Sequence, residues 1–112
     1  MHAPDAIASL SALAQEVRLS VFRYLVTVGP AGVAASRIAE HVGVAPSTLS
    51  FHLKELTHAG LIDPRPEGRF VMYAANFERM NALLDFLTEN CCGGHPCAPS
   101  PRLTCASVRV PA

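Results

Sequence analysis

Four cysteines near the carboxyl end carry the chemistry that is easiest to recognise in this sequence. Three of them fall within seven residues, in the run Cys91-Cys92-Gly93-Gly94-His95-Pro96-Cys97. The two glycines let the chain fold back, so the three thiols can converge on one ion. Thiolate sulfur is a soft ligand that selects thiophilic ions over Mg²⁺ or Ca²⁺. The spacing therefore predicts an ion site formed by Cys91, Cys92 and Cys97.

The number of converging ligands decides which ion such a site would bind. Trivalent arsenic or antimony keeps a lone pair and is satisfied by three sulfurs in a pyramid. Zinc requires four tetrahedral ligands, for which His95 or Cys105 could be the fourth. A redox switch, in which Cys91 or Cys92 pairs with Cys97 or Cys105 on oxidation, is a further possibility. Incidental cysteines that merely oxidise in vitro are the plainest alternative.

The composition narrows the class of protein. Its 112 residues suffice for one compact domain, and half of them are hydrophobic, so a real core is possible. All four cysteines lie in the last quarter of the chain, unlike those of a disulfide-stapled secreted domain. No apolar run approaches the roughly 20 residues of a membrane span, and Asp5 stands where a signal peptide would carry Lys or Arg. We expect a cytoplasmic protein in a reducing compartment.

The elements that position these cysteines follow from apolar spacing and turn residues. The pattern predicts helices over 5–28 (in two pieces), 35–42, 46–59 and 77–89. It predicts strands over 61–65 and 70–74, joined by a turn at 66–69. The first helix carries an apolar stripe formed by Ile7, Leu10, Leu13 and Ala14. We expect one folded domain over residues 1–90 and a largely flexible, cysteine-containing tail over 91–112.

Two of these helices, over 35–42 and 46–59, are separated by a three-residue turn that contains Gly43. This arrangement is typical of a helix-turn-helix, and the hairpin that follows makes it winged. The predicted fold class is mainly α (α+β), a winged helix-turn-helix with about five helices plus a two-stranded β-hairpin wing. No cysteine begins a predicted helix, where its pKa would be lowered, which disfavours a thiol enzyme.

The second helix of the pair would present a polar face to DNA. A leucine stripe faces the core, so we expect the side chains that point outward to be Ser47, Thr48, Ser50, Phe51 and Lys54. Small hydroxyls at a helix amino end can bind phosphate or base edges, and Phe51 can contact a thymine methyl group. Lys54, Arg69 and His58 are the candidate phosphate contacts. We expect His52 to be a packing or hydrogen-bonding residue.

The net charge of the chain bears on the interpretation that it binds DNA. Nine Lys and Arg residues balance nine Asp and Glu residues, whereas a purely electrostatic nucleic-acid binder is strongly basic. A binder that relies on local positive charge and dimerisation remains compatible with the sequence. A merely solvated helix face is the alternative, but the ordered set of short helix, glycine turn, Pro-Ser-Thr start, leucine stripe and hairpin favours DNA binding.

Three segments resemble the ArsR/SmtB family of metal-responsive repressors. They are LAQEVRLSVFRYL over 13–25, IAEHVGVAPSTLSFHLKEL over 38–56 and AGLI over 59–62. The resemblance implies a homodimeric winged-helix repressor whose first and last helices form the dimer interface. Two recognition helices would then enter successive major grooves of a roughly palindromic, double-stranded operator.

The resemblance also bears on the effector, because members of this family sense ions at different places on one scaffold. A cysteine pair in the helix over 35–42 is absent here, and a His–carboxylate site along the last helix would have Asp85 and Glu89 but no histidine. The arsenic-responsive branch includes proteins with paired cysteines just past the last helix and a third a few residues on. The resemblance thus implies As(III) or Sb(III) as effector, no permanent cofactor, and Cys91, Cys92 and Cys97 as ligands. A repressor responsive to zinc, cadmium, lead or thiol oxidation is the alternative.

Overall fold

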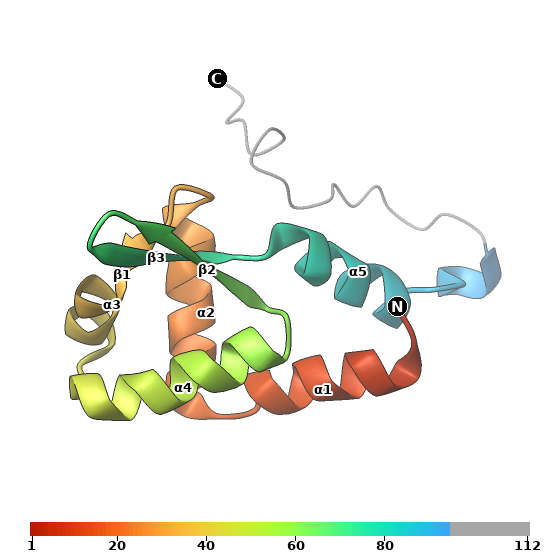
Figure 1. The fold of residues 1–112 in the computed structure, drawn as a ribbon. Helices are drawn as coiled ribbons and strands as arrows, with labels where there is room; N and C mark the ends of the chain where they lie inside the picture. The colour runs from red at the N-terminus through yellow and green to blue at the C-terminus, as the bar shows by residue number, and fades with distance from the viewer. Residues whose placement is uncertain (95–112) are drawn as a thin grey trace, which may run out of the picture.

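A computed structural model describes residues 1–94 of the chain. Over these residues five α-helices and one three-stranded antiparallel sheet form a winged helix-turn-helix, which confirms the predicted fold class (Figure 1). The elements are α1 (Ala3–Leu13), α2 (Glu16–Val28), β1 (Val33–Ala34), α3 (Ala35–Val42), α4 (Pro46–His58), β2 (Ile62–Glu67), β3 (Phe70–Ala75), α5 (Phe77–Leu87) and a 3-10 turn, η1 (Cys91–Gly94). Most of the predicted tail, with His95, Cys97 and Cys105, lies outside the described residues.

Local capping explains where the helices begin and end. Gln15 and Asn76 are the N-caps of α2 and α5, and their side-chain oxygens accept hydrogen bonds from the backbone N–H groups of Arg18 (2.9 Å) and Arg79 (2.8 Å). The turn between α3 and α4 depends on Gly43, which is left-handed (φ +73°) and donates its N–H to the carbonyl of Ala39. The sequence predicted the start of α5 after Asn76 and the turn at Gly43, but not the cap at Gln15.

The core is centred on α2 and α4. The predicted leucine stripe of α4 is confirmed, because Leu49, Leu53 and Leu56 are all buried. They pack with side chains from the other elements: Val21, Phe22, Leu25, Ile38, Leu61, Ile62 and Met80. This packing fixes the rotation of α4 about its own axis.

The sheet has a third strand that the sequence did not predict. β1 pairs with β3 through Val33 and Tyr73, so the strand order is β1-β3-β2 and the predicted two-stranded hairpin, β2 and β3, forms part of a three-stranded sheet. A strand of two residues has no alternating pattern to recognise. Its approach to β3 requires Gly32, because a Cβ there would lie 2.6 Å from the carbonyl oxygen of Tyr73.

The apolar stripe of α1 lies largely outside the core. Ile7 and Leu10 are exposed, whereas Ala6, Ser9 and Ala12 are the buried residues of this helix. Small side chains let α1 approach its neighbours closely, so its inner face is the small-residue face. Across residues 1–94, none of the helices has the length and apolar character required to cross a bilayer.

Replacing Ser9 should stabilise the fold. Its hydroxyl is fully buried and has no hydrogen-bond partner within residues 1–94. Ser9→Ala removes this desolvated group and improves helix propensity, so we expect the free energy of unfolding to rise by about 1 kcal/mol. Thermal unfolding of Ser9→Ala beside Ser11→Ala, at an exposed position of the same helix, separates burial from propensity. A lower melting temperature for Ser9→Ala would contradict the expectation.

Candidate nucleic-acid interface and thiol pair

The outward face of α4 has the composition that the sequence predicted. Ser47, Thr48, Ser50, Phe51 and Lys54 are all exposed, and the ring of Phe51 is 57% exposed. Because the leucines on the opposite face are buried, no rotation of α4 can hide these side chains without opening the core. The helix thus presents a fixed polar face with one aromatic ring at its centre.

Hydrogen bonding limits what one of these hydroxyls can do. Ser50 Oγ donates to the carbonyl oxygen of Pro46 at 3.1 Å, so this hydroxyl retains only its acceptor capacity. No hydrogen bond or ion pair engages the side chains of Ser47, Thr48 or Lys54 within the described part of the chain. Those three groups are available to a ligand.

The hairpin of β2 and β3 carries two arginines with different roles. Arg65 pairs with Glu67 (Nε to Oε2, 2.9 Å) and donates to the carbonyl oxygens of Pro30 (3.3 Å) and Ala31 (2.6 Å). It therefore clamps the hairpin to the turn that follows α2, a role that sequence reasoning missed. Arg69, at the hairpin turn, is exposed and forms no ion pair with any of residues 1–94, so its charge is available.

Behind the exposed face, His52 joins α4 to the start of α2. Arg18 donates to the Ala12 carbonyl oxygen through Nε (2.7 Å) and to His52 Nδ1 through Nη1 (3.3 Å). Burial lowers the pKa of His52, the nearby Arg18 charge lowers it further, and Glu55 partly opposes the shift. The prediction that His52 is a packing and hydrogen-bonding residue is confirmed.

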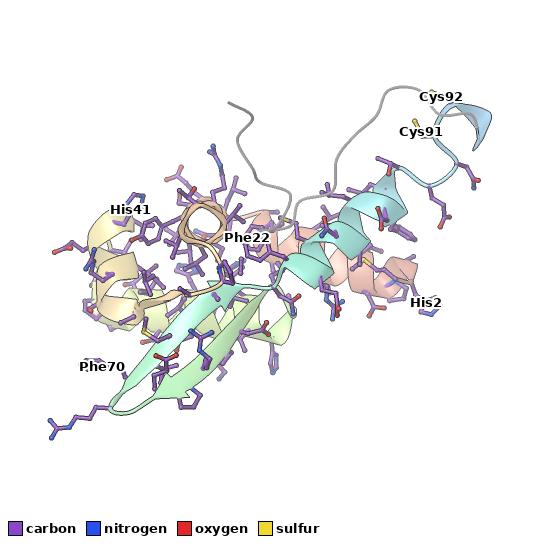
Figure 2. All side chains as sticks on the ribbon, turned by 90° about the horizontal axis from the view of Figure 1, so that it is seen from above. His2, Phe22, His41, Phe70, Cys91 and Cys92 are labelled. Carbon is purple, nitrogen blue, oxygen red and sulfur yellow. The ribbon has the colours of Figure 1, made fainter. Side chains whose placement is uncertain are left out.

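The paired cysteines lie at the opposite end of the molecule from the hairpin turn and the amino end of α4. The amino end of α4 and the hairpin turn lie toward the same end of the molecule, with α3 between them (Figure 1). Cys91 and Cys92 lie at the other, beyond α5 and far from Phe70 (Figure 2). Any influence of one end on the other must therefore pass through the helices between them.

The thiol pair itself is compact. Cys91 and Cys92 are exposed, and their sulfurs lie 3.6 Å apart. Two thiolates on one tetrahedral ion at about 2.3 Å would lie about 3.8 Å apart, so this spacing suits a shared ion. Cys92 is also disulfide-bonded. No three His, Cys, Asp or Glu side chains converge as a metal site among residues 1–94, Asp85 and Glu89 included.

Comparisons with known proteins identify the family. A family described as "Helix-turn-helix domain" matches residues 13–65. An ArsR-like transcriptional regulator from Rhodococcus sp. RHA1 is 26% identical, with a TM-score of 0.67 over 75% of this chain and 76% of that one. A structure described as a possible transcriptional regulator for arsenical resistance is 32% identical, with a TM-score of 0.54 over 71% of this chain and 83% of that one. The chain belongs to the ArsR family of transcriptional regulators.

One further ArsR-family structure is informative about assembly. The homodimeric winged helix-turn-helix DNA-binding domain of Mb0332 from Mycobacterium bovis, a possible ArsR-family transcriptional regulator, is 25% identical. Its TM-score is 0.62 over 86% of this chain and 89% of that one. A comparison with curated proteins gives no significant match. As a member of the ArsR family, this chain is a DNA-binding regulator and not an enzyme, as the sequence predicted.

Stability of this ArsR-family fold should fall in mild acid because of His52. A folded-state pKa below the ordinary 6.5 means that the unfolded chain binds more protons, so the free energy of unfolding decreases as the pH falls through about 6.5. His52→Gln keeps an acceptor for Arg18 but does not titrate. Urea unfolding between about pH 8 and pH 5 should show a smaller loss for this variant than for the wild type.

The control for this experiment is His58→Gln, which removes an exposed imidazole from the same helix. We expect it to lose stability in acid as the wild type does. An equal loss in wild type and His52→Gln would show that the Arg18–His52 contact does not cause the acid sensitivity.

Proposed function

We propose that this ArsR-family regulator is a dimeric repressor that releases operator DNA when As(III) or Sb(III) binds Cys91, Cys92 and Cys97. The observation that carries the proposal is the pair of sulfurs 3.6 Å apart directly beyond α5. The backbone of this segment turns tightly, with Cys92 left-handed (φ +54°) and the N–H of Cys91 bonded to the carbonyl of Thr88 at 2.9 Å. Two of the three proposed ligands are thus already adjacent.

The chemistry of the donors favours the trivalent ion. Sulfur ligands select thiophilic ions, and three sulfurs complete the pyramid that As(III) adopts. A zinc site would need a fourth ligand. The 32% identical relative described as a possible regulator for arsenical resistance supports the same effector class.

Dimerisation is supported by an apolar face on α1 and α5. These two helices lie side by side (Figure 1) and expose large apolar side chains that none of residues 1–94 covers. The side chains are Ile7, Leu10, Leu84 and Leu87. Ile7 is 63% exposed and Leu87 is 54% exposed, and large apolar side chains exposed on neighbouring helices indicate an interaction surface. The relative from Mycobacterium bovis is a homodimer.

We assign the DNA contacts to the exposed groups of α4 and the hairpin. Ser47 and Thr48, at the amino end of α4, are placed to bind phosphate or base edges, and Ser50 can act only as an acceptor. Phe51 would contact a thymine methyl group. Lys54 and Arg69 would bind phosphates, and a dimer doubles both charges on a protein of zero net charge.

The two ends communicate through the dimer face in this mechanism. An ion bound beyond α5 ties the following residues to the end of that helix, which forms half of the apolar face. The relative orientation of the two DNA-binding lobes then changes and their spacing no longer fits the operator. A coupling free energy of about 1–3 kcal/mol corresponds to a 5- to 150-fold change in affinity, and DNA must weaken ion binding by the same factor.

The disulfide of Cys92 favours a second candidate function. A repressor that responds to oxidation would lose DNA affinity when a disulfide forms in the cysteine segment. A disulfide at Cys92 excludes this sulfur as an ion ligand, so ion sensing requires the reduced protein and redox sensing involves the oxidised one. Experiments with and without a reductant can therefore separate the two functions.

Operator release by arsenite tests the proposed function. Fluorescence anisotropy would follow the reduced protein, kept in a phosphine reductant, on a duplex that it selects from a random pool. We expect arsenite to weaken binding about 5- to 150-fold in the wild type. The variant Cys91→Ser/Cys92→Ser should bind DNA normally and ignore arsenite, while Cys105→Ser, the matched control, should still respond.

Other outcomes of this experiment would contradict the arsenite proposal. Arsenite release by Cys91→Ser/Cys92→Ser would place the site elsewhere. Release by Cd²⁺ or Zn²⁺ but not by arsenite would identify a different effector. Release by peroxide alone, reversed by dithiothreitol, would support the redox function instead.

A charge on the apolar face should separate the subunits. Leu87→Glu places a carboxylate in the α1–α5 face, so we expect light scattering to show the monomer mass and DNA affinity to fall. Phe51→Glu is the control, because it adds the same charge to the exposed face of α4. It should remain a dimer while losing DNA affinity. A dimeric Leu87→Glu protein would overturn the assigned interface.

A further inference from the structure

The tip of the hairpin carries an aromatic ring that the assigned DNA contacts do not use. Phe70 is the first residue of β3, stands opposite Glu67 in the register, and is 65% exposed. Its ring points away from the body of the molecule, at the end remote from the cysteines (Figure 2). Val71, which follows it, is exposed as well. A phosphate contact would gain nothing from these apolar groups.

The charged residues near Phe70 indicate which surface its ring would contact. Arg65 and Glu67 neutralise each other within the hairpin, whereas Arg69 has no ion-pair partner in residues 1–94. The tip thus combines one available guanidinium with one bare ring. The minor groove of DNA attracts arginine because of its negative potential. Proteins that bind this groove also insert apolar side chains between base steps and kink the duplex.

The hairpin is built stiffly enough to press a ring into DNA. Arg65 ties β2 to the carbonyl oxygens of Pro30 and Ala31. Pro64 and Pro66 fix φ along the same strand. β2 lies at the edge of the sheet, where a proline costs no interior hydrogen bond. Separating stacked bases requires such support, because a mobile hairpin would move aside instead.

We infer that Phe70 enters the minor groove beside the half-site read by α4 and acts as an apolar wedge that opens a base step and bends the operator. Arg69, assigned above to phosphate binding, would contact the phosphates that border the groove next to Phe70. Flexible pyrimidine–purine steps deform most easily, so Phe70 would favour operators with a TA or CA step at that position. This inference rests on the DNA-binding function and is independent of the effector.

DNA bending and base unstacking test the wedge. The selected duplex carries fluorophores at both ends for energy transfer and 2-aminopurine at the step next to the half-site. At saturating wild-type protein, we expect energy transfer and 2-aminopurine fluorescence both to rise. Phe70→Ala should lose both signals and bind about tenfold more weakly, whereas Phe70→Leu, which keeps an apolar side chain, should retain part of each.

Two matched variants separate this role from others. Phe51→Ala should weaken binding yet bend the duplex fully once saturated, because it removes a major-groove contact only. Val71→Ala should leave the bend unchanged. Normal bending by Phe70→Ala would overturn the inference, and so would a change in its oligomeric state, which would show that the ring faces a second copy. If the wild type bound no selected duplex, the DNA-binding function itself would fail.

Discussion

Burial of the leucine stripe on α4 is the constraint on which the rest of the structure depends. Leu49, Leu53 and Leu56 are packed against α2 and the sheet, so α4 cannot rotate without creating cavities. Its other face is therefore presented in one orientation. The Arg18–His52 contact holds the same helix to the start of α2 from behind. The proposed DNA-reading surface, made of small hydroxyls and one ring, would depend on such rigidity, because each of its contacts would be individually weak.

This rigidity shapes how a distant site can act. The packing of α2 against α4 makes the DNA-binding lobe one body, so an ion beyond α5 cannot easily reshape α4 itself. It can change the angle between two such bodies if they meet through α1 and α5, where Ile7 and Leu87 are exposed. Sliding or rotation at an apolar interface costs less than repacking a core. The placement of the thiols next to that face is therefore consistent with control of a dimer's geometry.

The sequence predicted what is encoded locally. Helix ends at Gly43 and Asn76, the leucine stripe and the hairpin depend on a few neighbouring residues, and the structure has them where they were expected. The strand β1 depends on a close approach between Gly32 and Tyr73, which are far apart in the sequence. The clamp formed by Arg65 likewise joins groups 34 and 35 residues away. Apolar periodicity could not show whether the stripe with Ile7 meets its own core or another surface; only the family resemblance, which implies a dimer interface on the first helix, favoured the second.

In the candidate site, too, some features could be predicted from neighbouring residues and others could not. Side chains of α4 could be assigned to the exposed face because one periodic stripe determines both faces of a helix. The sulfurs of Cys91 and Cys92 lie close together in a segment with left-handed backbone at Asn90 and Cys92, two residues that are not glycine and gave no signal of this in the sequence. For DNA binding, the balance of charge matters more than its total. Nine Lys and Arg residues are balanced by nine Asp and Glu residues, and Arg65 is paired with Glu67, so we expect counterion release to supply less of the DNA affinity than in a strongly basic protein. In the proposed DNA complex, the exposed residues Phe51 and Phe70 would add apolar contacts that salt does not screen.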